Sequence, residues 1–387
     1  MGGQKAVKAA DPTPWIPLLA EYRLTTLAFD NVVEGTLHAH LTATSPEVAE
    51  VLSRWSAPAY LQMKDGSTHV VLVCPVREPP KRWPWMHAAL FLATLVTTLA
   101  AGALMVGRDP FGTQALRLGE LVIPYPSEVT WSVLWLGAPF ALPFLGVLLA
   151  HEMGHYVAAR AHRVRATLPY FVPFPPYFSI IGTVGAFIRL LGPMVRRVTL
   201  FDIGAAGPIA SFVVSLPLLA VGLGLSEVVP GPVSPMTPFA IHFAGQTVWL
   251  GNGLLTHLLA SALAPVPVGD ALLLLHPLAL VGWLGLFVTA LNLLPLGQLD
   301  GGHVLYALSP RRHGPAARAF VVALVPLGFV WWGWWAWALV VLLVNRGRIG
   351  HPTVLQDEPT IGPLRRALGW ALIATFFLTF VPVPIGL

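Results

Sequence analysis

Residues 147–155 read VLLAHEMGH and end an apolar run that begins near residue 133. On a helix, His151 and His155 are four positions apart, so they lie on one face, close enough to bind one metal ion. Glu152 follows His151 and projects beside such a metal, where it is placed to take a proton from a bound water. Ionisable side chains in a membrane helix are costly unless they pair, bind a metal or face a polar cavity. The pattern therefore predicts a metal site on a membrane helix, and the alternative is a helix end whose polar residues reach water.

The composition indicates a protein that is solvated mainly by lipid. Of its 387 residues, 55% are hydrophobic and only 11% are charged, whereas soluble domains carry about 25% charged residues. The net charge of +5 is too small and too dispersed to favour nucleic-acid binding. The single cysteine, Cys74, excludes an intrachain disulfide and a cysteine-rich zinc site, and its strand-like surroundings favour a buried, inert thiol.

Apolar runs of roughly 20 residues, the length that crosses a bilayer, recur along the chain. The last long run is interrupted by Pro326, Gly328 and Gly333, so it is either one tilted helix or a helical hairpin. We therefore expect an α-helical integral membrane protein with six or seven transmembrane helices. Residues 236–265 are also apolar, and we expect them to lie along the external membrane surface or to pack on the bundle. The expected spans are 86–106, 133–156, 200–224, 276–295, 317–344 and 368–385.

Basic residues flank these spans on alternating sides and predict the orientation. Cytoplasmic loops carry an excess of Lys and Arg, which places the N-terminus and the segment between the second and third spans in the cytoplasm. Because the N-terminus does not resemble a transit peptide, the expected location is a bacterial cytoplasmic membrane. The residues on which this orientation rests are Lys81 and Arg82, then Arg160, Arg163, Arg165, Arg189, Arg196 and Arg197, and then Arg311, Arg312 and Arg318.

The chain divides by composition into three parts. Residues 1–80 are predicted to form a small soluble α/β module, with strands at 33–41 and 69–76. A helix at 47–55 would begin at Ser45 and Pro46, which are typical N-cap and N1 residues. This module is either a plain folded appendage or a regulatory or substrate-recruiting domain. Residues 81–345 form the membrane-embedded core, and 346–387 hold a loop and the last transmembrane helix.

A catalytic zinc ion needs a third protein ligand and leaves its fourth position for water. The downstream glutamates, Glu227 and Glu358, lie in loop-like surroundings. Asp300 follows the fourth span in the stretch NLLPLGQLDGGH, residues 292–303, and the predicted orientation brings it to the side and depth of the two histidines. Asp202, at the start of the third span, is the alternative, either as a ligand or as an N-cap. His303 is either a donor to the site or a structural residue.

The pairing of HExxH with a distant NxxP…LDG segment resembles the site-2 protease family of intramembrane zinc metalloproteases, peptidase family M50. The chain is similar to the cyanobacterial and plastid subgroup of this family in two segments, FDIGAAGP at 201–208 and GQLDGG at 297–302. It also resembles that subgroup in lacking a PDZ-like insertion. The resemblance implies one zinc ion held by His151, His155 and Asp300, with Glu152 as catalytic base. It also implies that Asn292 and Pro295 shape the helix that carries Asp300. One departure is Ser211, where family members often have Asn, and this weakens any polar role assigned to that position.

The segment after the motif, residues 169–191, is suited to holding an unwound substrate. Its prolines forbid a regular helix, and residues 180–190, with Gly182 and Gly185, predict a strand pair or short re-entrant β element. Irregular backbone at membrane depth needs protein or a polar cavity beside it. We hypothesise that this strand pairs with the substrate by β-augmentation, and the alternative is a simple cytoplasmic loop.

The resemblance implies a substrate with one transmembrane segment, such as a membrane-tethered regulatory protein. From the small net charge, no nucleic-acid partner is expected. One rival is another type of membrane zinc peptidase, which would use a downstream glutamate as ligand. The other is a non-catalytic receptor or transporter, in which Glu152 would be dispensable.

Overall fold

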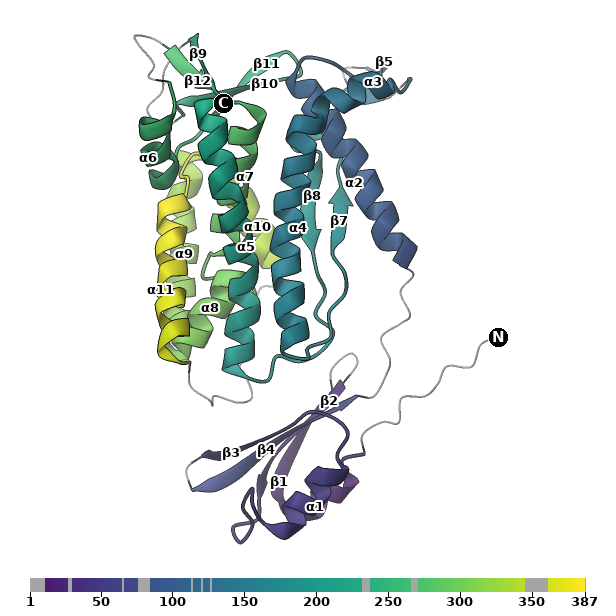
Figure 1. Cartoon of the computed structure of the whole chain (residues 1–387), viewed down its shortest axis with the longest axis vertical. Coiled ribbons are helices and arrows are strands. Elements are labelled where there is room, and N and C mark those ends of the chain that lie inside the picture. Colours follow the sequence, from purple (N-terminus) through teal and green to yellow (C-terminus); the bar gives the residue numbers. More distant parts are fainter. Residues whose placement is uncertain are drawn as a thin grey trace, which may run out of the picture.

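A helical bundle and a small α/β module below it make up the structure (Figure 1). It is a computed structural model that describes residues 11–26, 30–64, 66–75, 84–112, 114–119, 121–125, 127–231, 237–265, 271–344 and 361–386. Parts of the expected cytoplasmic N-terminus and residues 346–360 of the expected C-terminal loop, including Asp357 and Glu358, lie outside the described residues, as do Lys81, Arg82 and Asp270.

The N-terminal module is a four-stranded antiparallel sheet covered by one helix. The strands follow the order β1-β2-β4-β3, and Trp15, Val48 and Leu72 are buried in its core. Cys74 is buried on β4 as expected, and burial raises the pKa of its thiol to about 11, so it is protonated and unreactive at neutral pH. The elements are the 3-10 helix η1 (Thr13–Leu18), β1 (Leu19–Thr26), β2 (Asp30–Leu37), α1 (Pro46–Arg54), β3 (Ala59–Lys64) and β4 (Ser67–Pro75).

Two strands and one helix of this module were expected, and β1 and β3 were not. Ser45 does precede α1, with Pro46 in its first turn, but its side chain makes no capping hydrogen bond. Its hydroxyl instead accepts a hydrogen bond from the backbone N–H of Thr42 at 2.8 Å. The N-cap position was therefore right, whereas the chemistry assigned to it was not.

Four helical segments are long and apolar enough to cross a membrane, by length and composition. They are α2 (Pro84–Met105), the continuous stretch formed by α3 (Trp131–Leu134), the 3-10 turn η2 (Trp135–Gly137) and α4 (Ala138–Ala161), then α5 (Arg197–Gly224) and α9 (Pro310–Val330). Shorter helices complete the bundle: α7 (Pro277–Asn292), α8 (Asp300–Leu308), α10 (Gly333–Val344) and α11 (Pro363–Thr379). The protein is thus a multi-pass membrane protein.

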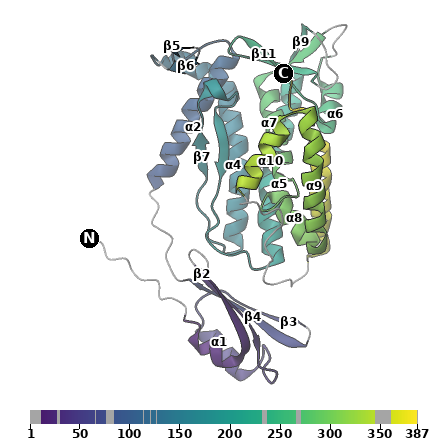
Figure 2. The same ribbon diagram turned by 180° about the vertical axis from the view of Figure 1, so that it is seen from behind.

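The long apolar run at 317–344 is two helices rather than one. α9 ends at Val330, and α10 begins at Gly333 and packs back against it (Figure 2). Gly328 makes this contact possible, because a Cβ there would lie 1.7 Å from Nε1 of Trp335. Of the two alternatives expected from the sequence, the hairpin is the one that forms.

A β-hairpin follows α4 and lies between α4 and α2 (Figure 1). It consists of β7 (Tyr170–Pro173) and β8 (Thr183–Phe187), paired antiparallel, with the single 3-10 turn η3 (Pro176–Phe178) between them. Gly182, at φ +69°, approaches α2 so closely that a Cβ would lie 2.3 Å from the carbonyl oxygen of Thr97. The predicted strand pair therefore forms beside the motif helix rather than in a free loop.

The opposite end of the bundle carries strands that were not expected. A mixed five-stranded sheet has the order β13-β11-β10-β12-β9. Of the apolar stretch 236–265, β10 and β11 belong to this sheet, and α6 packs against α5 and α11. Packing on the bundle, one of the two expected alternatives, is therefore confirmed. This end holds β5 (Gln114–Leu118), β6 (Leu121–Tyr125), β9 (Glu227–Pro230), β10 (Phe239–Phe243), β11 (Gln246–Leu250), α6 (Leu254–Leu263), β12 (Ala271–Leu274) and β13 (Ile385–Gly386).

Asp202 ties three helices together at the end of the bundle nearest the module. Its carboxylate accepts hydrogen bonds from Arg365 of α11, at 2.6 and 2.8 Å, and lies 2.8 Å from Nε2 of His162 at the end of α4. It is inside the second turn of α5, whose N-cap is Arg196. The role of N-cap considered for Asp202 is therefore wrong.

Candidate metal centre

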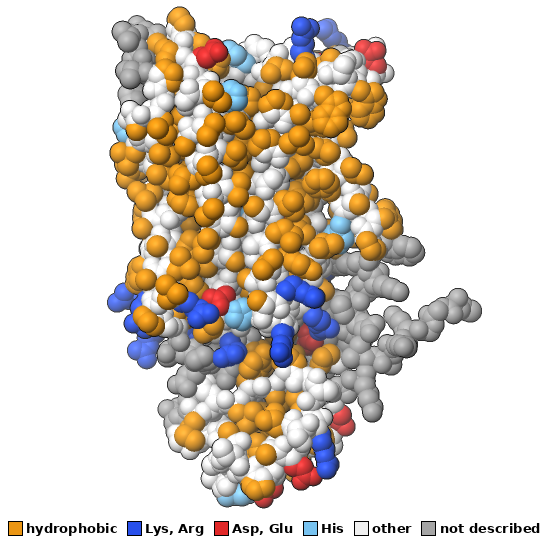
Figure 3. Space-filling model, in the orientation of Figure 1, with side chains coloured by type: hydrophobic (Ala, Val, Ile, Leu, Met, Phe, Trp, Pro, Cys, Tyr) orange, Lys and Arg blue, Asp and Glu red, His pale blue; other side chains and the backbone are white. Residues whose placement is uncertain are grey.

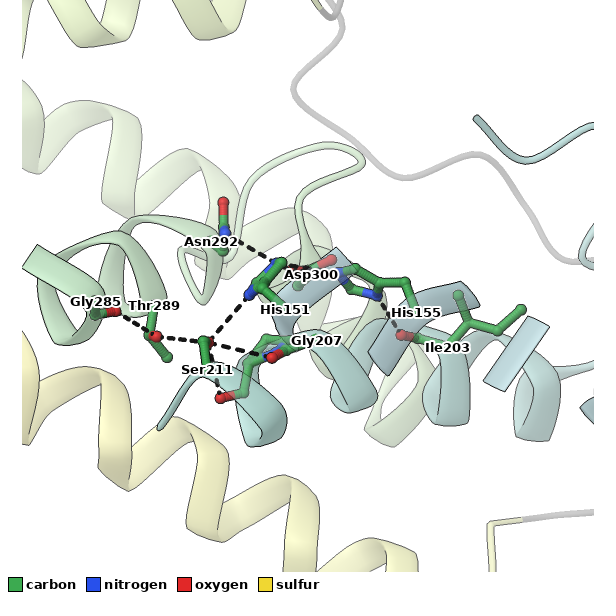
Figure 4. A network of polar contacts seen from close by, with 10 residues as sticks. His151, His155, Ile203, Gly207, Ser211, Gly285, Thr289, Asn292 and Asp300 are labelled. Atoms are coloured by element: carbon green, nitrogen blue, oxygen red, sulfur yellow. Dashed lines mark hydrogen bonds and ion pairs between the residues drawn. The ribbon is translucent and has the colours of Figure 1, made fainter. Parts of the chain in front are cut away.

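Three potential metal ligands meet between α4 and α8 (Figure 4). His151 and His155 are one turn apart on α4, and Asp300 is the first residue of α8. The two Nε2 atoms are 3.1 Å apart, and Oδ2 of Asp300 is 3.3 Å from each of them. The two histidines and the aspartate, which lies far from them in the sequence, thus form one compact group.

The spacing of these three atoms fits a tetrahedral zinc ion. Zinc binds histidine nitrogen at about 2.0–2.1 Å and carboxylate oxygen at about 2.0–2.2 Å, which places neighbouring ligand atoms about 3.3 Å apart. The observed separations of 3.1–3.3 Å match this edge length. Two imidazoles and a carboxylate are also a donor set that zinc commonly takes in catalytic sites, with the fourth position open. The cofactor implied is zinc.

Hydrogen bonds behind the histidines orient both rings. Nδ1 of His155 lies 2.7 Å from the carbonyl oxygen of Ile203, an acceptor, so Nδ1 carries the proton and Nε2 faces the other ligands. Nδ1 of His151 lies 3.0 Å from Oγ of Ser211. Such outer partners select the tautomer that leaves Nε2 free to bind metal.

Ser211 belongs to a buried polar chain that continues into α7. Its Oγ is 2.8 Å from Oγ1 of Thr289, whose hydroxyl donates to the carbonyl oxygen of Gly285 at 2.7 Å. The interpretation that serine weakens a polar role at this position is therefore wrong. The signal was present in the spacing, because Ser211 is one helical turn after Gly207 and Thr289 is three residues before Asn292, on similar faces of their helices.

Close contact between α4 and α5 makes room for the histidine rings. A Cβ on Gly154 would lie 2.5 Å from the carbonyl oxygen of Ala206, and a Cβ on Gly207 would lie 2.1 Å from Nε2 of His155. The small residues of the segment 206–208, AGP, thus allow α4 and α5 to approach each other closely, as small residues do in membrane bundles. They also leave the space that the second histidine occupies.

A tight turn between α7 and α8 delivers Asp300. α7 ends at Asn292, whose Nδ2 lies 3.2 Å from Nε2 of His151, and Pro295 lies in the connection. A Cβ on Gly301 would lie 1.9 Å from the carbonyl oxygen of Leu293, and one on Gly302 would lie 2.6 Å from that of Gly297. The two glycines after Asp300 are therefore required by the turn, and Asn292 contacts the site directly.

Glu152 is buried beside the metal group. Its carboxylate lies near the backbone of Ile188, the residue that follows β8. The glutamate therefore lies between the candidate metal position and the end of the hairpin strand. Gly185 is within that strand at φ +128°, with no atom near its absent Cβ.

The other candidate ligands lie apart from this group. Asp202 is engaged by Arg365 and His162. Glu227 is on β9 at the opposite end of the bundle. His303 is on α8 with its Cβ against Gly204 of α5. Among the described residues, the group that could hold a metal is His151, His155 and Asp300.

Replacing Gly207 by alanine is expected to lower zinc affinity by at least about 10-fold, because the new methyl group would displace the ring of His155. The matched control is Gly146→Ala on α4, where a Cβ meets nothing within 4 Å. Zinc content of the two purified variants, measured after dialysis against graded chelator, checks this. Equal zinc retention in both would contradict the assigned position of His155.

The chain is similar in sequence to known proteins. The model of the family described as peptidase family M50 matches residues 139–331, which include both histidines and Asp300. No solved structure matches the chain.

Several plant proteins are similar to this chain. The chain is 30% identical over 315 residues to "Probable zinc metalloprotease EGY1, chloroplastic" of Arabidopsis thaliana, covering 79% of this chain and 54% of the relative. It is 29% identical over 303 residues to the EGY1 protein of Oryza sativa subsp. japonica, with 76% and 48% covered. The EGY2 protein of Arabidopsis thaliana is 28% identical over 266 residues, with 64% and 42% covered. The chain thus spans about half the length of these relatives.

Proposed function

Because the chain belongs to peptidase family M50, we propose that it is an intramembrane zinc metalloprotease. Its proposed reaction is hydrolysis of peptide bonds within or near the transmembrane segments of other membrane proteins. The observation that carries the proposal is the convergence of His151, His155 and Asp300 at tetrahedral spacing, in a bundle of apolar helices.

Each polar group of the site has a separate task in this reaction. The three ligands would hold a zinc ion, which would supply the Lewis acidity that acidifies water and polarises a peptide carbonyl. Glu152 takes a proton from the attacking water and passes it to the leaving amine nitrogen. Ser211 and Ile203 hold the imidazole rings in the tautomer that the ligand role needs. Asn292, 3.2 Å from His151, restricts the position of that ring.

We propose that the substrate is bound as an extended strand along β8. A transmembrane helix keeps its peptide bonds inside its own hydrogen-bonded ladder, so it must unwind before it is cut. β8 pairs with β7 on one edge, and no described strand pairs with its other edge. The strand also exposes Val184 and Phe187, and Ile188, the residue that follows it, lies near Glu152. A segment added to this edge would run directly to the catalytic base.

The proposed membrane arrangement has six or seven crossings. The Arg residues of the α4–α5 connection lie at the end of the bundle that carries the N-terminal module, and Arg165 binds Asp30 of that module. By the positive-inside rule this end is cytoplasmic, in what we propose to be a bacterial cytoplasmic membrane. The proposed substrate is a single-span regulatory protein.

The test is cleavage of a single-span membrane protein by the full chain in lipid vesicles, with the cut mapped by mass spectrometry. We expect a cut within or at the edge of the apolar segment. The variant Gly185→Pro should retain zinc and lose cleavage by about 10-fold or more, because proline fixes φ near −65° where this strand has +128°. It would also lose the N–H that bonds Oγ1 of Thr183 at 3.0 Å.

The matched control is Gly245→Pro, at a positive φ of +78° with open surroundings, in the turn between β10 and β11. It should cut like the wild type. Cuts confined to the substrate's soluble part would overturn the intramembrane proposal. Normal cleavage by Gly185→Pro would contradict only the proposal that the substrate binds along β8, and the proposed protease activity would stand.

A further inference from the structure

A large cleft separates the N-terminal module from the bundle. Its volume is about 890 Å³. The module contributes the end of α1 with Trp55, and Tyr60 of the edge strand β3; the bundle contributes the residues after α4 and before α5. The two parts are held together beside it, because Nη2 of Arg165 bonds Oδ1 of Asp30 at 2.5 Å and Val195 packs against valines of β2 and β4.

The walls of this cleft are strongly cationic. Arg163, Arg165 and Arg196 line it, and Asp30 is the acidic residue among the lining groups. Asp30 is used by Arg165, which leaves Arg163 and Arg196 with no ion pair to any acidic residue in the described part of the chain. His162, a further lining residue, is engaged by Asp202. The cleft therefore has two guanidinium groups available to a ligand.

The N-terminus of α5 adds to the positive potential of the cleft. Arg196 is the N-cap of this 28-residue helix, no side chain caps it, and its first turn holds no acidic residue. The partial positive charge at a helix N-terminus favours anions. Two guanidinium groups in one cleft with a helix start suit a phosphate, which accepts several charge-assisted hydrogen bonds.

The position of the cleft relative to the apolar surface of the bundle indicates the source of such a phosphate. Lys and Arg gather at the lower border of the apolar surface of the bundle, next to the module (Figure 3). In the orientation proposed above, this border lies at the headgroups of the cytoplasmic leaflet, and basic pockets at this level suit anionic lipid headgroups. Trp55 and Tyr60 in the opposite wall are residue types enriched at membrane interfaces.

We infer that the cleft binds the headgroup of an anionic phospholipid, with the phosphate between Arg163 and Arg196. A lipid held there would join the module, the α4–α5 connection and the membrane. A cytoplasmic segment of the substrate is a poorer occupant, because such flanks carry an excess of Lys and Arg and would be repelled.

The experiment counts lipids that stay bound to the full chain purified from mixed phosphatidylglycerol and phosphatidylcholine, by native mass spectrometry. The wild type should retain phosphatidylglycerol over phosphatidylcholine. The double variant Arg163→Gln/Arg196→Gln should retain roughly 10- to 30-fold less. The control Arg108→Gln/Arg117→Gln removes the same charge from exposed residues at the other end of the bundle and should bind like the wild type. Arg163→Lys/Arg196→Lys keeps the charge and should retain most of the lipid, which separates lost charge from misfolding.

Equal lipid retention by the glutamine variant and the wild type would overturn the inference. Displacement of the lipid by millimolar inorganic phosphate would show that a free anion, rather than a lipid, is the ligand, and would overturn it as well. Displacement by hexaglutamate would overturn it in favour of an acidic peptide.

Discussion

Replacing Glu152 by glutamine should abolish cleavage and leave zinc bound. The two side chains have nearly the same volume, so the buried position beside Ile188 can accept the amide. Glu152 is outside the ligand group of His151, His155 and Asp300, so metal binding does not need its charge. An amide cannot take a proton from water, and loss of a general base costs about 10²- to 10⁴-fold in rate.

The measurement is single-turnover cleavage of the single-span substrate, together with zinc content of the same preparation. Glu227→Gln, on β9 at the other end of the bundle, is the matched control and should cut normally. A Glu152→Gln enzyme that cuts like the wild type would favour the non-catalytic receptor or transporter over a protease. One that loses its zinc would show that Glu152 acts on the metal rather than on water.

Replacing Asp300 by alanine should remove both zinc and activity. Oδ2 of Asp300 is 3.3 Å from each histidine nitrogen, so it is the one anionic donor of the group. Loss of an outer-shell partner already costs about 10- to 100-fold in metal affinity, and loss of a direct ligand should cost more than about 100-fold. Zinc titration against a competing chelator measures this, with cleavage at saturating zinc as a second readout.

Asp202→Ala is the control for this prediction, because Asp202 was the alternative third ligand. Its carboxylate is held by Arg365 and His162 instead, so the variant should bind zinc as the wild type does. If Asp300→Ala kept its zinc while Asp202→Ala lost it, the ligand assignment would have to be reversed.

The metal site could be predicted because its constraints are local or topological. His151 and His155 share a helix face through their spacing alone. The position of Asp300 could be predicted because successive membrane helices alternate in direction, which returns the chain to the side of the membrane where the two histidines lie. The role of Ser211 could be predicted only in part, because its spacing places it one turn after Gly207, whereas the packing angle between α4 and α5 decides whether its hydroxyl reaches His151. The hairpin of β7 and β8 was indicated by the prolines and glycines that exclude a helix.

The strands that were missed share a physical cause. In the module, β2 and β4 are central and carry buried valines, whereas β1 and β3 are the edges of the sheet. Edge strands need little burial, so LAEYRLTT and AYLQMK carry a weak pattern. The strands of the five-stranded sheet have five residues or fewer. Apart from the β10–β11 hairpin, their pairings join segments that are far apart in the sequence.

The ligands come from helices that are made at different times. His151 and His155 are on α4, but Asp300 arrives 149 positions later in the chain (300 minus 151), after α5 and α7 have been synthesised. The ribosome therefore inserts the histidine helix well before the complete ligand set exists. A nascent chain has no complete zinc site until α7 and α8 have folded against α4 and α5. The proposed proteolytic activity would therefore begin only after most of the bundle is in the membrane, so a partly made chain could not cut its own newly made helices.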